Sequence, residues 1–194
     1  MRCRFRTLLL LAVTVTTYLS SSQGQLPASS QEVDLAVTYV AQGSKFTPGQ
    51  FFWRQGGSME LSTETYHGFG IAANFTGSDA NNIVGSGIDL NTFTTTFGPR
   101  YTWHRRSGRV SLFGQGLIGE SHGWNSIFPQ ATGATSDFNT FALQVGGGAD
   151  LRISRHFAIR AIQADWIRTE FPNATTNVQN TLRLGAGVVL RLPH

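Results

Sequence analysis

The sequence predicts an all-β fold, an eight-stranded antiparallel up-and-down β-barrel whose strands cross a membrane. Three observations lead to this prediction. Apolar and polar residues alternate with a period of two in eight successive segments. Short and long polar connections alternate between those segments. The polar side of the segments is rich in small residues and carries few charges, which are balanced in sign.

The N-terminal residues 1–24 are predicted to be a secretory signal peptide, which leaves residues 25–194 as one barrel domain. Three arginines within the first six residues precede an apolar run that continues to Leu19. Ser22 and Gly24 then occupy the −3 and −1 positions of a cleavage site before Gln25. The run is too short to span a bilayer.

Composition excludes several classes of protein. The chain has 15 Lys+Arg and 11 Asp+Glu, and removing the three leader arginines leaves 12 against 11, a net charge of +1. Nucleic acid is therefore not an expected partner. The single cysteine, Cys3, lies in the leader, so the mature chain is no disulfide scaffold. No apolar stretch of about 18 residues exists, which argues against a helical membrane protein.

The first four predicted strands place an apolar or bulky residue at every second position, opposite a polar face. This pattern is typical of a sheet with one apolar and one polar side. The apolar faces are Val33, Leu35, Val37 and Tyr39; Met59, Leu61 and Thr63; Phe69, Ile71, Ala73 and Phe75; and Phe93, Phe97, Tyr101 and Trp103.

The fifth and sixth predicted strands differ in clarity. Residues 110–119 read as a strand with ambiguous faces, because Phe113 and Leu117 have one parity and Leu112 and Ile118 the other. The sixth strand alternates clearly, so its apolar side can be assigned. That side comprises Phe141, Leu143, Val145, Ala149 and Leu151.

The seventh predicted strand begins with Phe157 and Ile159 opposite Arg160. Gln163 and Asp165 join the face of Arg160 only if the alternation shifts phase, which predicts a β-bulge near residues 161–162. The eighth strand is regular. Its apolar face is Leu182, Leu184, Ala186, Val188, Leu190 and Leu192.

The predicted connections alternate in length. Short turns are expected at 66–68, 105–108 and 154–156, and long polar loops near 42–56, 77–88, 121–137 and 170–179. This order is typical of outer-membrane barrels, in which tight turns face the periplasm and long loops face outward.

The polar faces are predicted to form the lumen. A soluble sheet would expose many lysines and glutamates, whereas these faces carry small residues and both signs of charge. Closure of the sheet pairs every backbone group, and eight strands leave room only for side chains. Buried charges need partners, so the acids and bases are expected to pair. The predicted lumen network is Asp34, Glu60, Glu64, Arg100, Asp150, Arg152, Arg160, Asp165, Arg183 and Arg191.

Large aromatic residues lie near the ends of several predicted strands, where interfacial girdles are expected. They are Tyr39, Phe93, Tyr101, Trp103, Phe157 and Trp166.

The sequence offers little catalytic chemistry. No pair of histidines has metal-ligand spacing, so neither a metal nor a cofactor is expected. Ser121, His122 and Glu120 are the nearest candidates for a hydrolytic relay. They are sequence neighbours on a strand end, so their side chains should diverge.

Three segments carry a resemblance to a known family: 97–101 (Phe-Gly-Pro-Arg-Tyr), 158–166 and 182–192. With them, the mature chain resembles the small outer-membrane barrels that include the OmpA transmembrane domain, OmpX and the opacity-type proteins. The resemblance implies a Gram-negative outer-membrane location and assembly by the barrel-assembly machinery. Family members usually end on an aromatic residue, whereas the last strand here ends at Leu192, followed by Pro193 and His194.

The expected function is that of a non-enzymatic integral outer-membrane barrel without a large pore, serving envelope integrity, adhesion or loop-mediated binding. The expected partners are outer-membrane lipid, the assembly machinery and an external loop ligand. Two alternatives stay open: a lipid-modifying hydrolase at the barrel rim, and a secreted lipocalin-like barrel whose apolar side chains face inward around a ligand.

Overall fold

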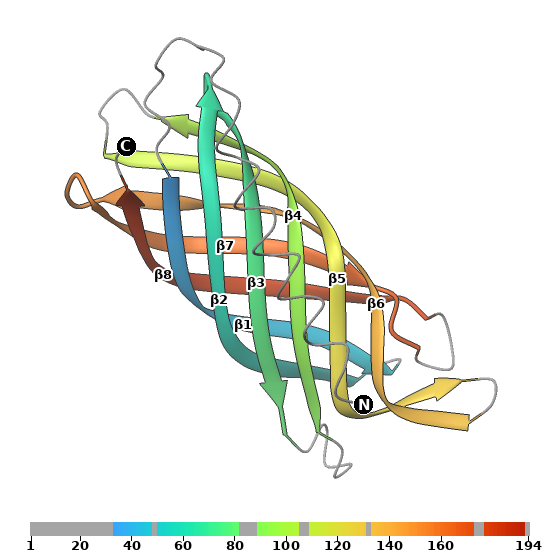
Figure 1. Ribbon diagram of the computed structural model, residues 1–194. Coiled ribbons are helices and arrows are strands. Elements are labelled where there is room, and N and C mark those ends of the chain that lie inside the picture. The colour runs from blue at the N-terminus through green and yellow to red at the C-terminus, as the bar shows by residue number, and fades with distance from the viewer. Residues whose placement is uncertain are drawn as a thin grey trace, which may run out of the picture.

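The chain forms one closed barrel in which every strand is antiparallel to its neighbours (Figure 1). The computed structural model describes residues 33–47, 50–81, 89–104, 109–130, 133–172 and 177–192. The proposed signal peptide and the predicted turn at 105–108 lie outside these ranges. The strands are β1 (Val33–Thr47), β2 (Gln50–Tyr66), β3 (Phe69–Ala80), β4 (Leu90–His104), β5 (Val110–Gln130), β6 (Gly133–Arg152), β7 (Phe157–Thr169) and β8 (Gln179–Leu192).

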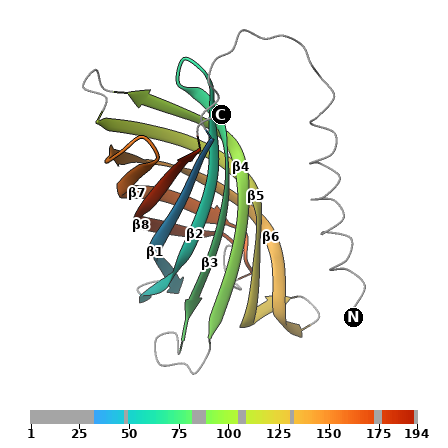
Figure 2. The same cartoon turned by 60° about the vertical axis from the view of Figure 1, so that its left-hand side comes forward.

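Closure comes from the pairing of the first strand with the last. β1 pairs with β2 on one side and with β8 on the other, from Val33 opposite Leu192 to Ser44 opposite Thr181. No strand is therefore left as a free edge along the barrel wall, and the backbone groups of the wall bond to one another. Both views show the strands inclined to the long axis (Figures 1 and 2). Within the described residues, no helix is long and apolar enough to cross a membrane.

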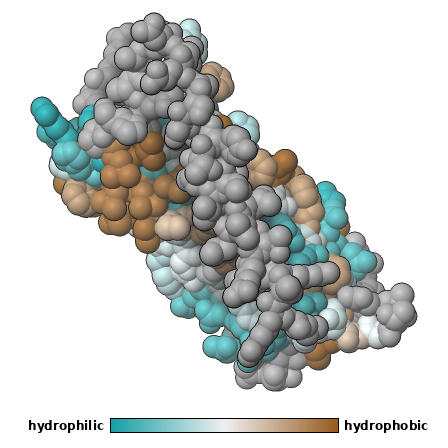
Figure 3. Space-filling view, in the orientation of Figure 1, coloured by the Kyte–Doolittle hydropathy of each residue, from teal (hydrophilic) through white to brown (hydrophobic). Residues whose placement is uncertain are grey.

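The period-two alternation sets the two faces of the wall as predicted. On β1, Val37 and Tyr39 are exposed on the outside, while Ala36 and Thr38 are buried in the lumen. Figure 3 shows brown, apolar areas on the outer wall of the barrel. Polar side chains thus line the inside and apolar side chains cover the outside.

The ambiguous faces of β5 are resolved by space inside the barrel. Phe113 and Leu117 point into the lumen, while Leu112 and Ile118 are exposed outside. A Cβ atom on Gly148 of the facing strand β6 would lie 2.8 Å from the Phe113 ring. The glycine at position 148 therefore leaves the volume that this large ring fills.

The predicted β-bulge in β7 is confirmed. Arg160 pairs with Asp150 of β6 and Ile162 with the adjacent Ala149, which leaves Ala161 as the extra residue. On the other side of β7, the register with β8 shifts between Arg160 and Gln163. The bulge returns Gln163 to the lumen face that Arg160 occupies.

Two of the predicted loops are wrong, because the strands run much further. Within 42–56, β1 continues to Thr47 and β2 begins at Gln50. Within 121–137, β5 and β6 pair out to Gln130 opposite Gly133. Pairing with the neighbouring strand extends into both segments, although the β5–β6 register shifts between Trp124 and Phe128. The β5–β6 hairpin extends past its neighbours, at the lower right of Figure 1.

The short turns at 66–68 and 154–156 are found where predicted. His67 and Gly68 form the β2–β3 turn with positive φ angles of 48° and 88°. The β6–β7 turn is closed by Ser154 Oγ, which accepts bonds from the backbone N–H groups of His156 and Phe157. These tight turns define one end of the barrel, which we call the turn end; the opposite end is the loop end.

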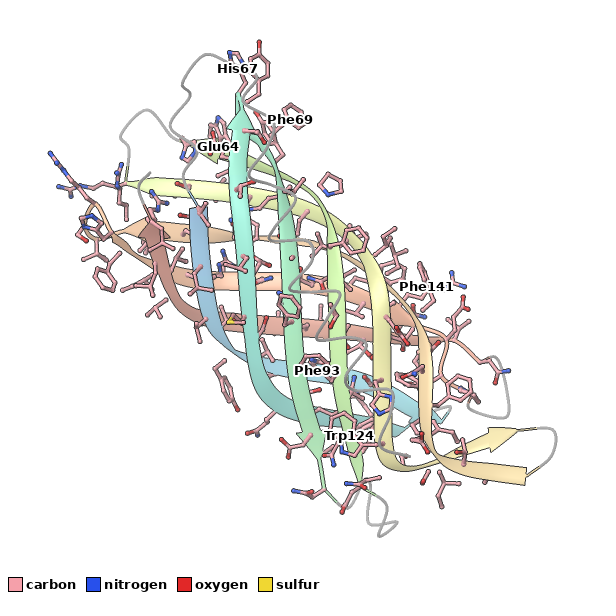
Figure 4. All side chains as sticks on the ribbon, viewed as in Figure 1. Glu64, His67, Phe69, Phe93, Trp124 and Phe141 are labelled. Atoms are coloured by element: carbon pink, nitrogen blue, oxygen red, sulfur yellow. The ribbon has the colours of Figure 1, made fainter. Side chains whose placement is uncertain are left out.

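Exposed aromatic side chains lie on the wall toward both ends (Figure 4). Tyr39, however, lies midway along β1, at the seventh of the fourteen pairings between β1 and β2, because that strand continues beyond the predicted loop boundary. The turn-end group is Tyr66, Phe69, Tyr101, Trp103 and Phe157, and the loop-end group is Phe51, Trp53, Phe93, Phe141 and Trp166.

Candidate functional site in the barrel lumen

The centre of the lumen is organised around the carboxylate of Glu60, which is 1% exposed. Its Oε1 atom accepts hydrogen bonds from Nη1 of Arg100 and Nη1 of Arg160, each at 2.7 Å. Arg160 also donates from Nε to Asp150 Oδ1 at 2.9 Å. Both guanidinium groups lie over the Phe113 ring, with Cζ 3.8 Å and 4.4 Å from its centroid. The inward-facing Phe113 thus supports two cations by cation–π contact.

A second cluster lies next to it toward the loop end, around Asp165 and Arg183. Arg183 donates from Nε and Nη2 to Asp165 Oδ2, at 3.1 Å and 2.8 Å. Its Nη1 donates to Thr76 Oγ1 and Asn74 Oδ1. Asn74 Nδ2 in turn donates to Glu60 Oε2 at 3.2 Å. The two clusters therefore form one continuous network across the barrel.

The turn-end mouth is also polar, but it is open to water. A small pocket there is lined by Asp34, Glu64, Asp150 and Arg191, among others. Arg191 Nε lies 3.8 Å from Asp34 Oδ1. The position of Glu64 at this end is visible in Figure 4.

His104 bridges two strands at the same mouth. Its Nε2 atom is 2.7 Å from Glu64 Oε2 and its Nδ1 atom is 3.1 Å from Ser111 Oγ. Serine, histidine and carboxylate are thereby connected by hydrogen bonds. The alternation placed Glu64 on the polar face, but it gave no sign of the contact between His104 and Ser111, because Ser111 belongs to the strand with ambiguous faces.

One predicted member of the lumen network lies elsewhere. Arg152 is exposed at the end of β6 and makes no ion pair within the described residues. Arg152 lies on the same face of β6 as Asp150, which is buried in the lumen. Because the strand ends at Arg152, however, its side chain projects into water beyond the lumen. The other nine predicted residues face the lumen or its turn-end mouth.

The loop-end mouth is closed by an apolar cluster that the sequence reasoning missed. We call it the apolar plug; it consists of Phe52, Ala80, Leu90, Phe128 and Phe171. The rings of Phe128 and Phe171 stack with centroids 5.3 Å apart. Phe52 was assigned to a loop, although its alternation with Trp53 and Arg54 is the signal that could have placed it inward.

Sequence reasoning also missed Arg54, for the same reason as Phe52. It is buried directly beneath the plug, two positions along β2 from Phe52. Its Nη2 atom donates to Gln42 Oε1 at 3.1 Å, and its Nη1 donates to Thr92 Oγ1 at 3.1 Å.

The residues considered for a hydrolytic relay near 120–122 do not come together. Ser121 is buried in the lumen, where its hydroxyl shares a hydrogen bond with Thr94. His122 bonds to Asn139, and Glu120 is exposed on the wall. Adjacent residues of a strand face opposite sides, which separates Ser121 from both His122 and Glu120.

Comparison with solved structures shows the fold of small outer-membrane β-barrels. Neisserial surface protein A matches with a TM-score of 0.62 at 11% identity, over 82% of this chain and 97% of that one. Ail, the attachment invasion locus protein of Yersinia pestis, matches with a TM-score of 0.58 at 18% identity, over 84% and 99%. A structure of Ail in complex with the heparin analogue sucrose octasulfate matches with a TM-score of 0.57 at 20% identity, over 84% and 99%. No protein-family model and no curated protein matches the sequence.

Proposed function

We propose that the chain is a non-enzymatic integral protein of the bacterial outer membrane, which anchors in the bilayer through its wall and presents its loop end at the cell surface. The observation that carries this proposal is the inverted distribution of side chains. Ile71 and Val188 are 65% and 50% exposed on the wall, while Arg160 and Arg183 are 0% and 1% exposed inside.

This distribution fits lipid and not water as the surroundings of the wall. A continuous apolar surface of this size is unfavourable in water, whereas acyl chains solvate it well. The aromatic groups toward both ends fit the two membrane interfaces. The lipocalin-like alternative requires the opposite orientation, with apolar side chains converging on the interior.

The proposed partners follow from the two ends and the wall. Outer-membrane lipid surrounds the wall, and the barrel-assembly machinery inserts the chain. The β5–β6 hairpin projects beyond the paired wall, because β4 stops pairing with β5 at Trp124 and β7 stops pairing with β6 at Ala142. It offers the longest described surface for a loop ligand or an adhesion contact.

The test combines the state of the barrel with its location. The mature chain refolded in detergent should migrate differently on gels before and after boiling, and the native protein should fractionate with outer membranes. Protease applied to intact cells should cleave at the loop end and leave the turn end intact. A product extractable without detergent would contradict the proposal.

A matched pair of arginine substitutions tests lipid contact directly. Val188→Arg places a charge on the middle of the wall and should destabilise the inserted barrel by about 2–4 kcal/mol. Asn180→Arg places the same charge on the exposed face of β8 near its loop end, and should change stability little. Equal stability of the two variants in lipid would contradict a bilayer around the wall.

The bridge formed by Ser111, His104 and Glu64 favours a second candidate function, hydrolysis of an ester at the turn-end mouth. In such a reaction the Ser111 hydroxyl attacks the ester carbonyl, His104 takes the hydroxyl proton and passes it to the leaving alcohol, and water then releases the acid. Glu64 would orient the imidazole.

This candidate is tested by active-site labelling. A fluorophosphonate probe should label the refolded wild-type chain at Ser111, and the Ser111→Ala variant should lose the label. Ser121→Ala serves as the control, because Ser121 bonds to Thr94 and lies apart from any histidine contact in the described structure. Absence of labelling in the wild type excludes this function and leaves the first proposal standing.

A further inference from the structure

The buried guanidinium of Arg54 has surroundings unlike those of the other lumen arginines. It is 6% exposed and lies beneath the apolar plug. Its hydrogen-bond partners are neutral: Gln42 Oε1, Thr92 Oγ1 and Ser44 Oγ. Its Nε–H group has no acceptor in the described structure. The group thus retains a full positive charge and a free donor in a water-poor place.

Arg54 differs from the other lumen arginines in the charge of its partners. Arg100, Arg160 and Arg183 each approach a carboxylate within 2.8 Å. Among the described residues, no Asp or Glu oxygen lies within the 4.0 Å of Arg54 that would make an ion pair. An isolated buried charge costs several kcal/mol, so this position calls for a negative partner that the described chain does not supply.

The groups around Arg54 suit an anion. Ser44 shares a hydrogen bond with Thr181 at 2.7 Å, and Ser78 shares one with Thr92 at 2.8 Å. In each pair either oxygen can donate, so the hydroxyl hydrogens can turn toward a negative charge without moving the backbone. The apolar plug lowers the local dielectric and strengthens the attraction between the guanidinium and an anion.

We propose that Arg54, with the hydroxyl groups of Ser44 and Thr92, binds one small inorganic anion of halide size beneath the apolar plug. The small size follows from the surroundings, because Gln42 contacts the same guanidinium and Phe52 of the apolar plug lies two positions away on the same face of β2. The anion supplies the counter-charge for Arg54 and so stabilises the loop end of the barrel.

The test measures thermal unfolding of the refolded mature chain in detergent at constant ionic strength, in sodium chloride, sodium bromide, sodium phosphate or sodium gluconate. We expect chloride and bromide to raise the unfolding midpoint saturably by about 4 °C over gluconate. Arg54→Gln should remove this difference. Arg152→Gln, which removes the same charge from an exposed arginine, should keep it.

Equal midpoints in halide and gluconate for the wild type would overturn the proposal, as would an unchanged halide response in Arg54→Gln. A response to phosphate alone would overturn the assignment of a halide-sized site. Should Arg54→Gln fail to fold, crystals of the wild type in bromide decide the matter. An anomalous peak at hydrogen-bond distance from the guanidinium supports the site, and an ordered water in its place refutes it.

Discussion

Single residues inside the barrel are held by ion pairs that have almost no access to water. Asp165 and Arg183 are each 1% exposed and share two hydrogen bonds. Such a pair contributes little over an apolar pair of the same volume, but the loss of one partner leaves a buried charge uncompensated. Its importance therefore shows only when it is broken on one side.

Asp165→Ala should lower the free energy of unfolding by about 3–5 kcal/mol, because Arg183 stays buried without its carboxylate. The second substitution Arg183→Met, made in the same chain, should recover much of this loss. The measurement is urea unfolding in detergent followed by gel mobility. A single variant as stable as the wild type would argue against the lumen ion pair.

At this scale the sequence indicates which residues face inward but not which ones meet. Period-two alternation placed Glu60 and Arg160 in the lumen, yet these residues are 100 positions apart and pair across the barrel. Their contact depends on strand register and tilt, which local pattern does not contain. Arg54 escaped notice because its segment reads as a polar loop.

Among the elements, β7 shows how one extra residue preserves a face. Ala161 is inserted opposite β6, so that Arg160 and Gln163 both stay in the lumen. Without Ala161, only Ile162 would stand between the two residues. They would then have the i, i+2 spacing of a regular strand and would still share one face. The extra residue can therefore be deleted without changing which residues face the lumen. A deletion elsewhere in the strand would change it.

Deletion of Ala161 should give a barrel that still folds, because Arg160, Ile162 and Gln163 then alternate regularly. Deletion of Ala164 should prevent folding, because it turns Asp165 outward and Trp166 into the lumen. Both variants lose one alanine from the same strand. The measurement is the fraction of heat-modifiable barrel after refolding, and comparable yields would contradict the register described here.

The type and order of the elements were predictable, because the alternation is strong in seven of the eight strands. The bulge was predictable because the apolar–polar alternation of the seventh strand shifts by one residue. Strand lengths were not. Polar, glycine-containing segments such as 42–56 resemble loops by composition, and only pairing with a neighbour shows that they continue as strands. The inward face of β5 depended on the space opposite Gly148, which is a tertiary property.

The whole molecule is a filled cylinder with unlike ends. The ion-pair network occupies its middle, and the apolar plug closes the loop end, where Phe128 is 4% exposed. The turn end keeps a small polar pocket. Eight strands enclose a cross-section that side chains can fill, and here charged and aromatic groups fill its middle and its loop end.

The filled lumen predicts that the refolded chain gives no steady single-channel conductance in planar bilayers. Ions would have to pass both the arginine–carboxylate clusters and the apolar plug, and each presents a barrier to a hydrated ion. A large porin inserted under the same conditions provides the positive control. Stable open events in the wild-type recordings would contradict the packing described here.

The difference between the two ends also determines from which compartment water and protons can enter the lumen. In the orientation proposed above, the dry aromatic end faces the surroundings of the cell, and the wet end, with His104 and Glu64, faces the periplasm. Protons and deuterons should therefore enter the interior from within the envelope. After sudden acidification of the medium, protons would reach these groups only once the periplasm had equilibrated. The proton concentration inside the barrel therefore follows that of the periplasm and not that of the medium.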